Sequence, residues 1–218
     1  MPHDTLDKAK INNFWQARTQ VADPRIATNY RDDGRLELDF RLVQSHATPQ
    51  SRVLDLGAGS CTLSGRLEPY VASVLAVDKY AGFLKHAPRS AKFSTECADI
   101  VDFRSQSVFD LILLFGVVNF LNVEDERALY ERCQAMLSSN GTFIVKNQCG
   151  VEGERIVDQH SSELDAHYHA RYPAYQSQLQ LLAEHFDVSA VDIYPPEINR
   201  WTDTHFYAFV CRHRSTSA

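Results

Sequence analysis

The stretch VLDLGAGSC, residues 53–61, decides the fold predicted for this chain. A strand pattern that ends in Asp55 leads directly into Gly57 and Gly59. Glycines at this point permit a tight turn and a close approach of the backbone to a ligand. Open α/β sheets bind ligands beyond the carboxyl ends of their strands. The stretch therefore predicts a first strand followed by a ligand-binding turn.

From residue 51 onward, short β-branched runs alternate with helical patterns, which is typical of parallel strands joined by crossover helices. The clearest helix is predicted at 123–137, where Leu129, Cys133 and Met136 recur at helical spacing. These patterns predict a Rossmann-like α/β sheet. Its strands are predicted at 51–57, 73–79, 91–99, 109–116 and 141–147, with further helices at 63–71 and 81–89.

The segments on either side of this core have different patterns. Helical stretches precede the first strand, and a polar stretch rich in His and Tyr follows the core, with a helix expected around 175–185. Two strands near the C-terminus, separated by a Pro-Pro turn, are expected to pair antiparallel. We therefore expect a single domain over 1–218, with an N-terminal helical lid (1–46), a ligand-binding core (47–148), a helical acceptor cap (149–185) and a C-terminal strand pair (186–214).

Composition narrows the classes of partner. The 218 residues carry a formal net charge of −6, which argues against a nucleic acid or an anionic membrane surface as a partner. The N-terminus lacks the apolar core of a signal peptide, and no apolar run approaches the roughly 18 residues that span a bilayer. We therefore expect a cytoplasmic protein. The five cysteines form no CxxC pair, so neither a disulfide framework nor a zinc site is expected.

Carboxylates at the ends of the predicted strands indicate the ligand. Asp55, two residues before the first glycine of the turn, suits a cationic amino group better than a pyrophosphate. Asp78 is placed to bond a ribose diol, and Asp99 and Ile100 would lie beside an adenine. A dinucleotide-binding turn would have a small residue where Thr62 stands. S-adenosylmethionine (SAM) is a ligand with these features.

Over residues 50–148 the chain resembles a class I SAM-dependent methyltransferase, and the C-terminal strand pair would complete the seven-stranded, mostly parallel sheet of that family. The resemblance implies SAM as cofactor. The chain departs from the family pattern at Asn119, where many members that act on small molecules have a histidine. This departure leaves the identity of a general base open. The residues expected to bind the cofactor are Asp55, Gly57, Ala58, Gly59, Asp78, Lys79, Asp99, Ile100, Phe115 and Gly116.

The acceptor side is predicted from topology. If the strand at 187–194 runs parallel to the core strands, the loop after it lies on the ligand side of the sheet and brings Asn199, Arg200 and Trp201 to the mouth of the cleft as substrate-binding residues. A hydroxyl acceptor needs a base, and His205 is the first candidate, with Asn119 and Tyr30 as alternatives. His205 could equally be a packing residue, and Asn119 a helix cap. His160, His167 and His169 are expected to face water, so no metal is expected.

The function predicted from these features is methyl transfer from SAM to a small-molecule acceptor, at a hydroxyl or an amine of a sugar derivative or a secondary metabolite. One alternative is a nicotinamide-dependent oxidoreductase, which Asp55 and Thr62 disfavour. Another is a SAM-binding protein without catalysis. A nucleic-acid methyltransferase is not expected, because no [DN]-PP-[YF] tetrapeptide follows the fourth strand.

Overall fold

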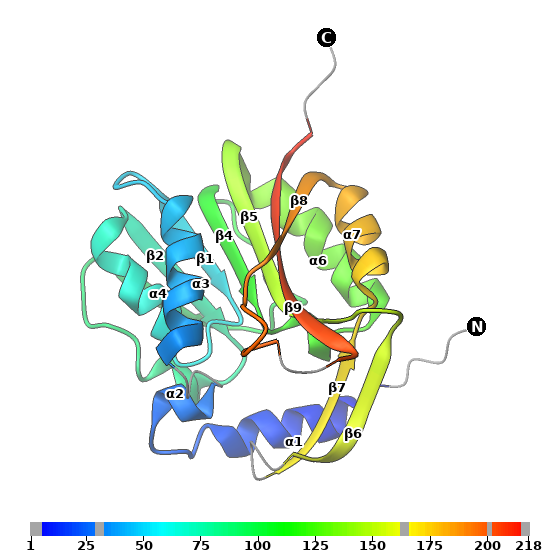
Figure 1. Ribbon diagram of the computed structural model, residues 1–218. Helices are drawn as coiled ribbons and strands as arrows, with labels where there is room; N and C mark the ends of the chain where they lie inside the picture. Colours follow the sequence, from blue (N-terminus) through cyan, green and yellow to red (C-terminus); the bar gives the residue numbers. More distant parts are fainter. Residues whose placement is uncertain (1–5, 29–32, 162–165, 200–201, 215–218) are drawn as a thin grey trace.

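The computed structural model describes residues 6–28, 33–161, 166–199 and 202–214. A central sheet lies between two helical layers, and further elements cover one end of it (Figure 1). The sheet consists of β1 (Arg52–Leu56), β2 (Ser73–Asp78), β3 (Phe93–Cys97), β4 (Phe109–Phe115), β5 (Leu137–Gly150), β8 (Phe186–Asp192) and β9 (Thr204–His213). The helices are α1 (Lys8–Arg18), α2 (Pro24–Ala27), α3 (Asp33–Ser45), α4 (Thr62–Leu67), α5 (Ala81–Leu84), α6 (Val123–Met136) and α7 (Tyr175–Ala183), with 3-10 turns η1 (Glu68–Tyr70) and η2 (Val118–Phe120).

The sheet has the topology that the sequence predicts. In the described part of the chain, its seven strands follow the order β3-β2-β1-β4-β5-β9-β8. The pairs from β3 to β5 are parallel, whereas β9 is antiparallel to both β5 and β8. The prediction of a Rossmann-like, mostly parallel seven-stranded sheet with an antiparallel C-terminal pair is confirmed.

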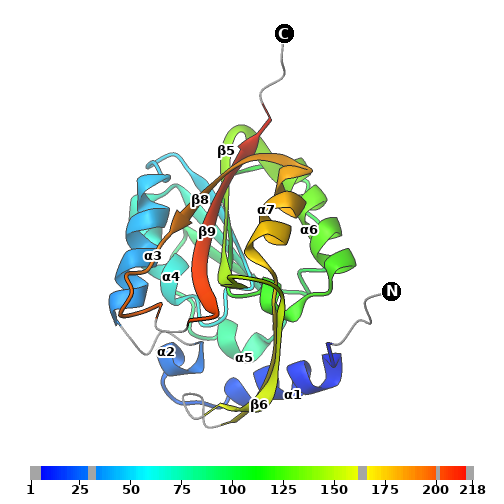
Figure 2. The same cartoon turned by 45° about the vertical axis from the view of Figure 1, so that its right-hand side comes forward.

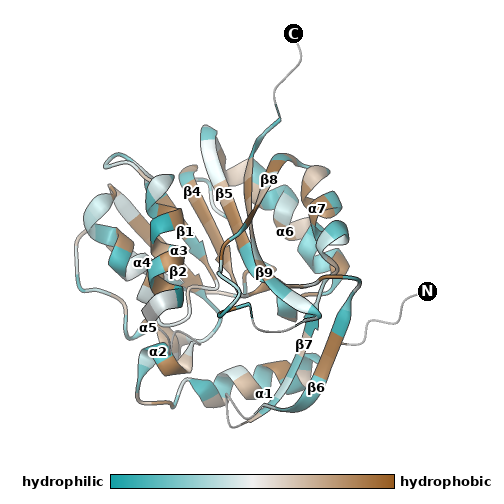
Figure 3. Cartoon of the chain, in the orientation of Figure 1, coloured by the Kyte–Doolittle hydropathy of each residue, from teal (hydrophilic) through white to brown (hydrophobic). Residues whose placement is uncertain are grey.

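The central strands β1, β2, β4 and β5 are largely buried on both faces, as expected of a parallel sheet covered by helices. Figure 3 shows β4 and β5 as predominantly hydrophobic strands in the middle of the molecule. Alternate residues of β4 enter two different apolar clusters: Ile112 packs with the cluster that includes Leu129 of α6, and Leu111 with the cluster that includes Phe40 of α3. Period 2 along β4 therefore directs alternate side chains into the two helical layers.

One secondary-structure prediction is wrong. The polar stretch after β5 is a hairpin of β6 (Arg155–Ser161) and β7 (Ala166–Tyr172) in antiparallel pairing, and not part of a helical cap. The hairpin packs on the N-terminal helix instead: the rings of Tyr168 on β7 and Phe14 of α1 lie 5.4 Å apart, and His169 is buried, contrary to the expectation that it faces water. Only the helix expected around 175–185 is present, as α7.

The carboxyl ends of the parallel strands face α1 and the β6–β7 hairpin. Figures 1 and 2 show α1 and the hairpin crossing beneath this edge of the sheet. The backbone N–H of Asp7 donates to Nε2 of His169 on β7 (2.9 Å), and Lys10 pairs with Asp158 on β6 (2.8 Å). These contacts fix α1 to the hairpin and form a cover. No helix of the described residues is both long and apolar enough to cross a bilayer.

Candidate active site

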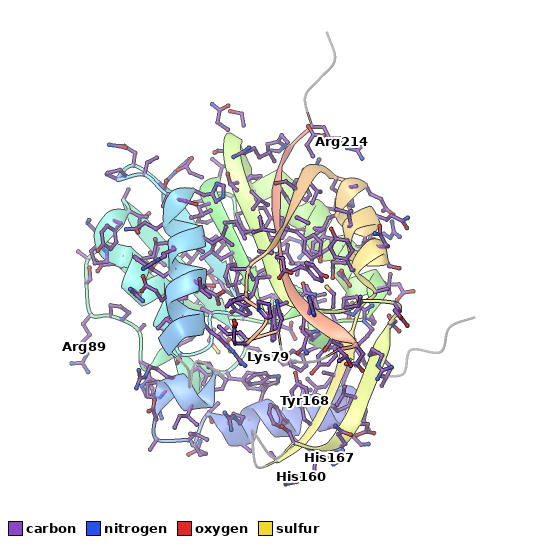
Figure 4. All side chains as sticks on the ribbon, in the orientation of Figure 1. Lys79, Arg89, His160, His167, Tyr168 and Arg214 are labelled. Atoms are coloured by element: carbon purple, nitrogen blue, oxygen red, sulfur yellow. The ribbon has the colours of Figure 1, made fainter. Side chains whose placement is uncertain are left out.

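A cavity of about 990 Å³ lies between the carboxyl ends of the parallel strands and this cover. Lys79, directly after β2, and Tyr168 on β7 both line it (Figure 4). Its volume is at the upper end of the roughly 300–1,000 Å³ of small-molecule sites, which leaves room for a cofactor and an acceptor together. All ten residues predicted to bind the cofactor line this cavity: Asp55, Gly57, Ala58, Gly59, Asp78, Lys79, Asp99, Ile100, Phe115 and Gly116.

The glycine turn after β1 needs glycine for two reasons. Gly57 and Gly59 have φ of +73° and +52°, in the left-handed region that residues with a Cβ rarely adopt. A Cβ on Gly57 would lie 2.3 Å from Cγ2 of Val117, and one on Gly59 would lie 2.7 Å from Cγ2 of Thr28. The turn is therefore packed between the segment after β4 and the segment after α2, and it lines the cavity with backbone.

Two buried carboxylates flank this turn. Burial, and secondarily the neighbouring Asp78, raises the pKa of Asp55 to about 6. Burial also raises the pKa of Asp78, although two backbone N–H groups oppose this shift. Those donors are Gly59, at 2.8 Å from Oδ2, and Tyr80, at 2.8 Å from Oδ1. Asp78 thus organises the turn as well as facing the cavity, and the site concentrates negative charge where a cationic ligand group would be stabilised.

Beyond the end of β3, the carboxylate of Asp99 forms an ion pair with Lys79. Oδ2 of Asp99 lies 2.8 Å from Nζ of Lys79, and Oδ1 accepts the N–H of Val101 at 3.1 Å. Although burial opposes it, these hydrogen bonds lower the pKa of Asp99. Asp99 therefore stays ionised and can accept a hydrogen bond from a ligand at neutral pH.

The cover supplies an aromatic wall that the sequence did not assign to the site. Trp15 of α1 lines the cavity and packs edge-to-face on Phe120 (5.2 Å between ring centroids) and near Phe83 (6.2 Å). Trp15 thus both packs α1 onto these rings and faces the cavity. Tyr168 and Tyr172 of β7 also line the cavity, so the N-terminal helix and the hairpin together form its outer wall.

The part of the cavity wall formed by β5 contains a buried lysine that sequence reasoning missed. Nζ of Lys146 on β5 donates to Oδ2 of Asp39 (2.8 Å) and to the hydroxyl of Tyr194 (3.0 Å), and that hydroxyl donates to Oδ1 of Asp39 (2.8 Å). Lys146 and Tyr194 line the cavity. No sequence motif signals this cluster, because its members lie 107 and 48 positions apart from Lys146.

The prediction that His205 borders the cleft is wrong. Thr204 and Phe206 of β9 line the cavity, and His205 between them points to the opposite face of the sheet. There its Nδ1 lies 3.8 Å from Oδ2 of Asp192, and its ring lies 6.1 Å from that of Tyr207, which packs on Tyr175 of α7. The topology was predicted correctly, but the face of the strand was not.

Asn119 lines the cavity and has a structural role in it. Its amide nitrogen donates to the backbone carbonyls of Gln148 (3.0 Å) and Arg171 (2.9 Å), which ties η2 to β5 and β7. A carboxamide does not take up a proton near neutral pH, so this geometry favours positioning over acid-base catalysis. Asn122, and not Asn119, caps α6 through its side-chain oxygen and the N–H of Asp125 (2.7 Å).

The loop between β8 and β9 lies at the ligand edge of the sheet, as the topology predicts. Asn199 is buried there and does not line the cavity. Its amide donates to Asp192 and to the carbonyl of Tyr194, and its Oδ1 accepts the N–H of Phe206 (each 2.9 Å), so it holds the loop in shape. Arg200, Trp201 and Tyr30 lie outside the described residues. Among the described residues, no three His, Cys, Asp or Glu side chains gather as metal ligands would.

Residues 53–141 match the family model described as a methyltransferase domain. The chain is 28% identical to a ubiquinone biosynthesis O-methyltransferase of Bradyrhizobium diazoefficiens over 66% of this chain and 63% of that protein. It is 24% identical to a phosphoethanolamine N-methyltransferase of Plasmodium falciparum over 68% of this chain and 58% of that protein. The match thus spans about three fifths of the length of these relatives.

A solved structure described as a DhpI–SAH complex has the same fold. It superposes with a TM-score of 0.71 over 94% of this chain and 96% of that one, at 14% sequence identity. The likeness extends over nearly the whole length of both chains, so the two share the fold.

Proposed function

We propose that this chain is a class I SAM-dependent methyltransferase that transfers a methyl group from SAM to a small-molecule acceptor; the matching methyltransferase-domain model and the shared fold support this. One observation carries the proposal. The ends of four neighbouring parallel strands place Asp55, Asp78, Asp99 and Gly116 around one cavity, in the order in which SAM presents its amino acid, ribose and adenine groups. The accepting group would be a hydroxyl or an amine.

The residues of the cavity fit SAM chemically. Asp55 is a buried carboxylate that a cationic amino group would stabilise, and the carboxylate of Asp78 can accept hydrogen bonds from a ribose diol. The turn at Gly57 and Gly59 exposes backbone to the ligand. SAM supplies an electrophilic methyl group on a sulfonium, so the protein's task is to bind, orient and exclude water. Trp15 and the β6–β7 hairpin serve the last of these by closing the cavity.

A nicotinamide-dependent oxidoreductase is the main alternative on a related fold. The buried carboxylate of Asp55 lies where a dinucleotide would bring its pyrophosphate, and burial next to a second carboxylate makes that approach unfavourable. A thermal-shift comparison separates the two. A ligand at 100 times its Kd adds about 2.7 kcal/mol, or roughly 5–11 °C for a chain of this size. We expect that shift from S-adenosylhomocysteine and none from NADH.

Transfer itself is tested by incubating the protein with methyl-labelled SAM and panels of small hydroxyl and amine compounds, followed by mass spectrometry. The proposal predicts a labelled product that Asp78→Asn forms far more slowly. Binding of S-adenosylhomocysteine without any labelled product across the panels would instead favour a SAM-binding protein without catalysis.

A further inference from the structure

We infer that the nucleophile accepted by this site is an anionic oxygen on a ring-bearing molecule, held beside Lys146. The inference rests on the proposed methyl transfer and specifies its acceptor. It follows from where Lys146 lies, which rings enclose it and how its charge is balanced.

Lys146 lies directly beside the expected cofactor contact. Its backbone carbonyl accepts the N–H of Gly116 at 2.7 Å, and Phe115 is its partner in the β4–β5 register. The side chain emerges from β5 on the cavity side of the sheet, where Gln148 and, from β9, Thr204 and Phe206 also line the wall. This wall is separate from Asp78 and Asp99 at the ribose and adenine end, so it borders the space for the acceptor.

Three aromatic rings surround the ammonium group. Nζ of Lys146 lies 5.3 Å from the ring centroids of Phe115 and Tyr194 and 5.6 Å from that of Phe206. Arg35 stacks on Phe206 as well, with Cζ at 5.8 Å from the ring centroid, and it also lines the cavity. Flat apolar walls around a fixed cation suit a flat molecule that carries negative charge at one edge.

The counter-charge lies behind the lysine. Asp39 of α3 is completely buried and is not part of the cavity wall, whereas Lys146 and Tyr194 are. The charged and titratable groups against the ammonium include Asp39 and Tyr194, with Arg35 nearby on Phe206. The wall presents cationic groups to the ligand, with the carboxylate behind them holding Lys146 in place.

A cation at this position selects between acceptor types. It disfavours a protonated amine and lowers the pKa of an acidic hydroxyl, by about one to three units for a charge within hydrogen-bonding range. The acceptor would lose its proton to solvent before the transfer. Its oxygen then forms a C–O bond to the methyl carbon while the C–S bond breaks and the electron pair goes to sulfur. An anion and a sulfonium thus become a neutral methyl ether or ester and a neutral thioether.

The test uses protein saturated with S-adenosylhomocysteine and two probes. The first is 4-nitrophenol, whose visible absorbance reports ionisation, and the second is benzoate. Removing Lys146 alone would take a charge partner from the buried Asp39, so the main variant is Lys146→Met with Asp39→Asn, which removes both charges together. Lys146→Arg keeps the charge, and Lys92→Met, outside the cavity, is the matched lysine control.

We expect bound 4-nitrophenol to ionise about one to three pH units below the free probe in wild type, Lys146→Arg and Lys92→Met, and not in the double variant. If the acceptor oxygen is a carboxylate, benzoate will bind instead and lose at least about tenfold affinity in the double variant. Either result supports the inference, and it shows whether the acceptor oxygen belongs to an acidic hydroxyl or to a carboxylate. If neither probe binds, or if every probe that binds does so with the same affinity and ionisation in the double variant as in wild type, the inference is overturned. Wild-type protein that does not bind S-adenosylhomocysteine at all would overturn the proposed function itself.

Discussion

Replacement of Asp55 by Asn should make the protein more stable and worse at binding its cofactor. Asp55 lies at the carboxyl end of β1, only 5% exposed, with a pKa raised to about 6 by burial. In the unfolded chain the same carboxyl has a pKa near 3.9. Because the folded pKa is the higher one, ionised Asp55 destabilises the fold above pH 6, and the penalty disappears as the pH falls through 6 towards 4.

The size of this penalty follows from the shift. A difference of about two pKa units corresponds to roughly 3 kcal/mol at pH 7.5, since one unit is about 1.4 kcal/mol. An Asn side chain is nearly the same size and carries no charge, so Asp55→Asn should raise the free energy of unfolding by up to about 3 kcal/mol, or about 6–12 °C in Tm. The gain should shrink towards zero near pH 4.

The assay is denaturant unfolding of both proteins without ligand, at pH 7.5 and at pH 4.5. Asp110→Asn is the matched control at the opposite edge of the sheet. The ion pair of Asp110 with Arg52 (3.0 Å) lowers the pKa of Asp110 to about 2, so that variant should be destabilised at pH 7.5. If Asp55→Asn were less stable than wild type at pH 7.5 with an unchanged m-value, the argument from burial would be refuted. A stabilised variant should also lose about 10- to 150-fold in affinity for S-adenosylhomocysteine.

Three further substitutions test other parts of the site. Asp78→Asn should weaken S-adenosylhomocysteine binding about 10- to 150-fold by calorimetry, and unchanged affinity in a folded variant would remove Asp78 from the site. Gly57→Val should lower the free energy of unfolding by at least about 1–3 kcal/mol, because φ at Gly57 is +73° and the new Cβ would meet Val117. Gly153→Ala is the control, since a Cβ at Gly153 meets nothing within 4 Å. Equal unfolding midpoints for the two variants would contradict the turn geometry. His205→Ala should leave turnover within about threefold of wild type, and a loss of ~10² or more would return His205 to the list of catalytic candidates.

The parallel core could be predicted from the sequence because its constraints are local. Strands buried on both faces are continuous apolar runs, and the turn after β1 requires glycines at fixed positions. The acids expected at the strand ends follow from the same rule, since each comes directly after or at the end of a predicted strand. Those residues all line one cavity.

The errors arose where the result depends on long-range register. His205 and Phe206 are adjacent, and only the pairing of β9 with β5 decides which of them faces the cavity. The β6–β7 hairpin is polar on its outer face. Its inner face is buried only because α1 packs against it, through the contact between Phe14 and Tyr168. Neither the register nor that contact is encoded in a local pattern.

Lys146 was missed for a related reason. In the run GTFIVKN a lysine near the end of an apolar strand looks like the point where the strand reaches solvent. Its buried partner Asp39 belongs to a helix in the N-terminal extension, and Tyr194 follows β8. A lysine in such a strand is worth considering as a buried ion-pair partner when an amphipathic helix elsewhere in the chain carries an Asp or Glu to which no other role has been assigned.

The central claim is that this cavity binds SAM through ionised Asp55, and its most direct test is a calorimetric titration with S-adenosylhomocysteine at pH 7.5 and pH 5.0, alongside NADH. The account predicts one binding site for S-adenosylhomocysteine and none for NADH. It also predicts about tenfold weaker binding at pH 5.0, because a carboxyl with a pKa of about 6 is then largely protonated. Binding of NADH without binding of S-adenosylhomocysteine, at either pH, would contradict it.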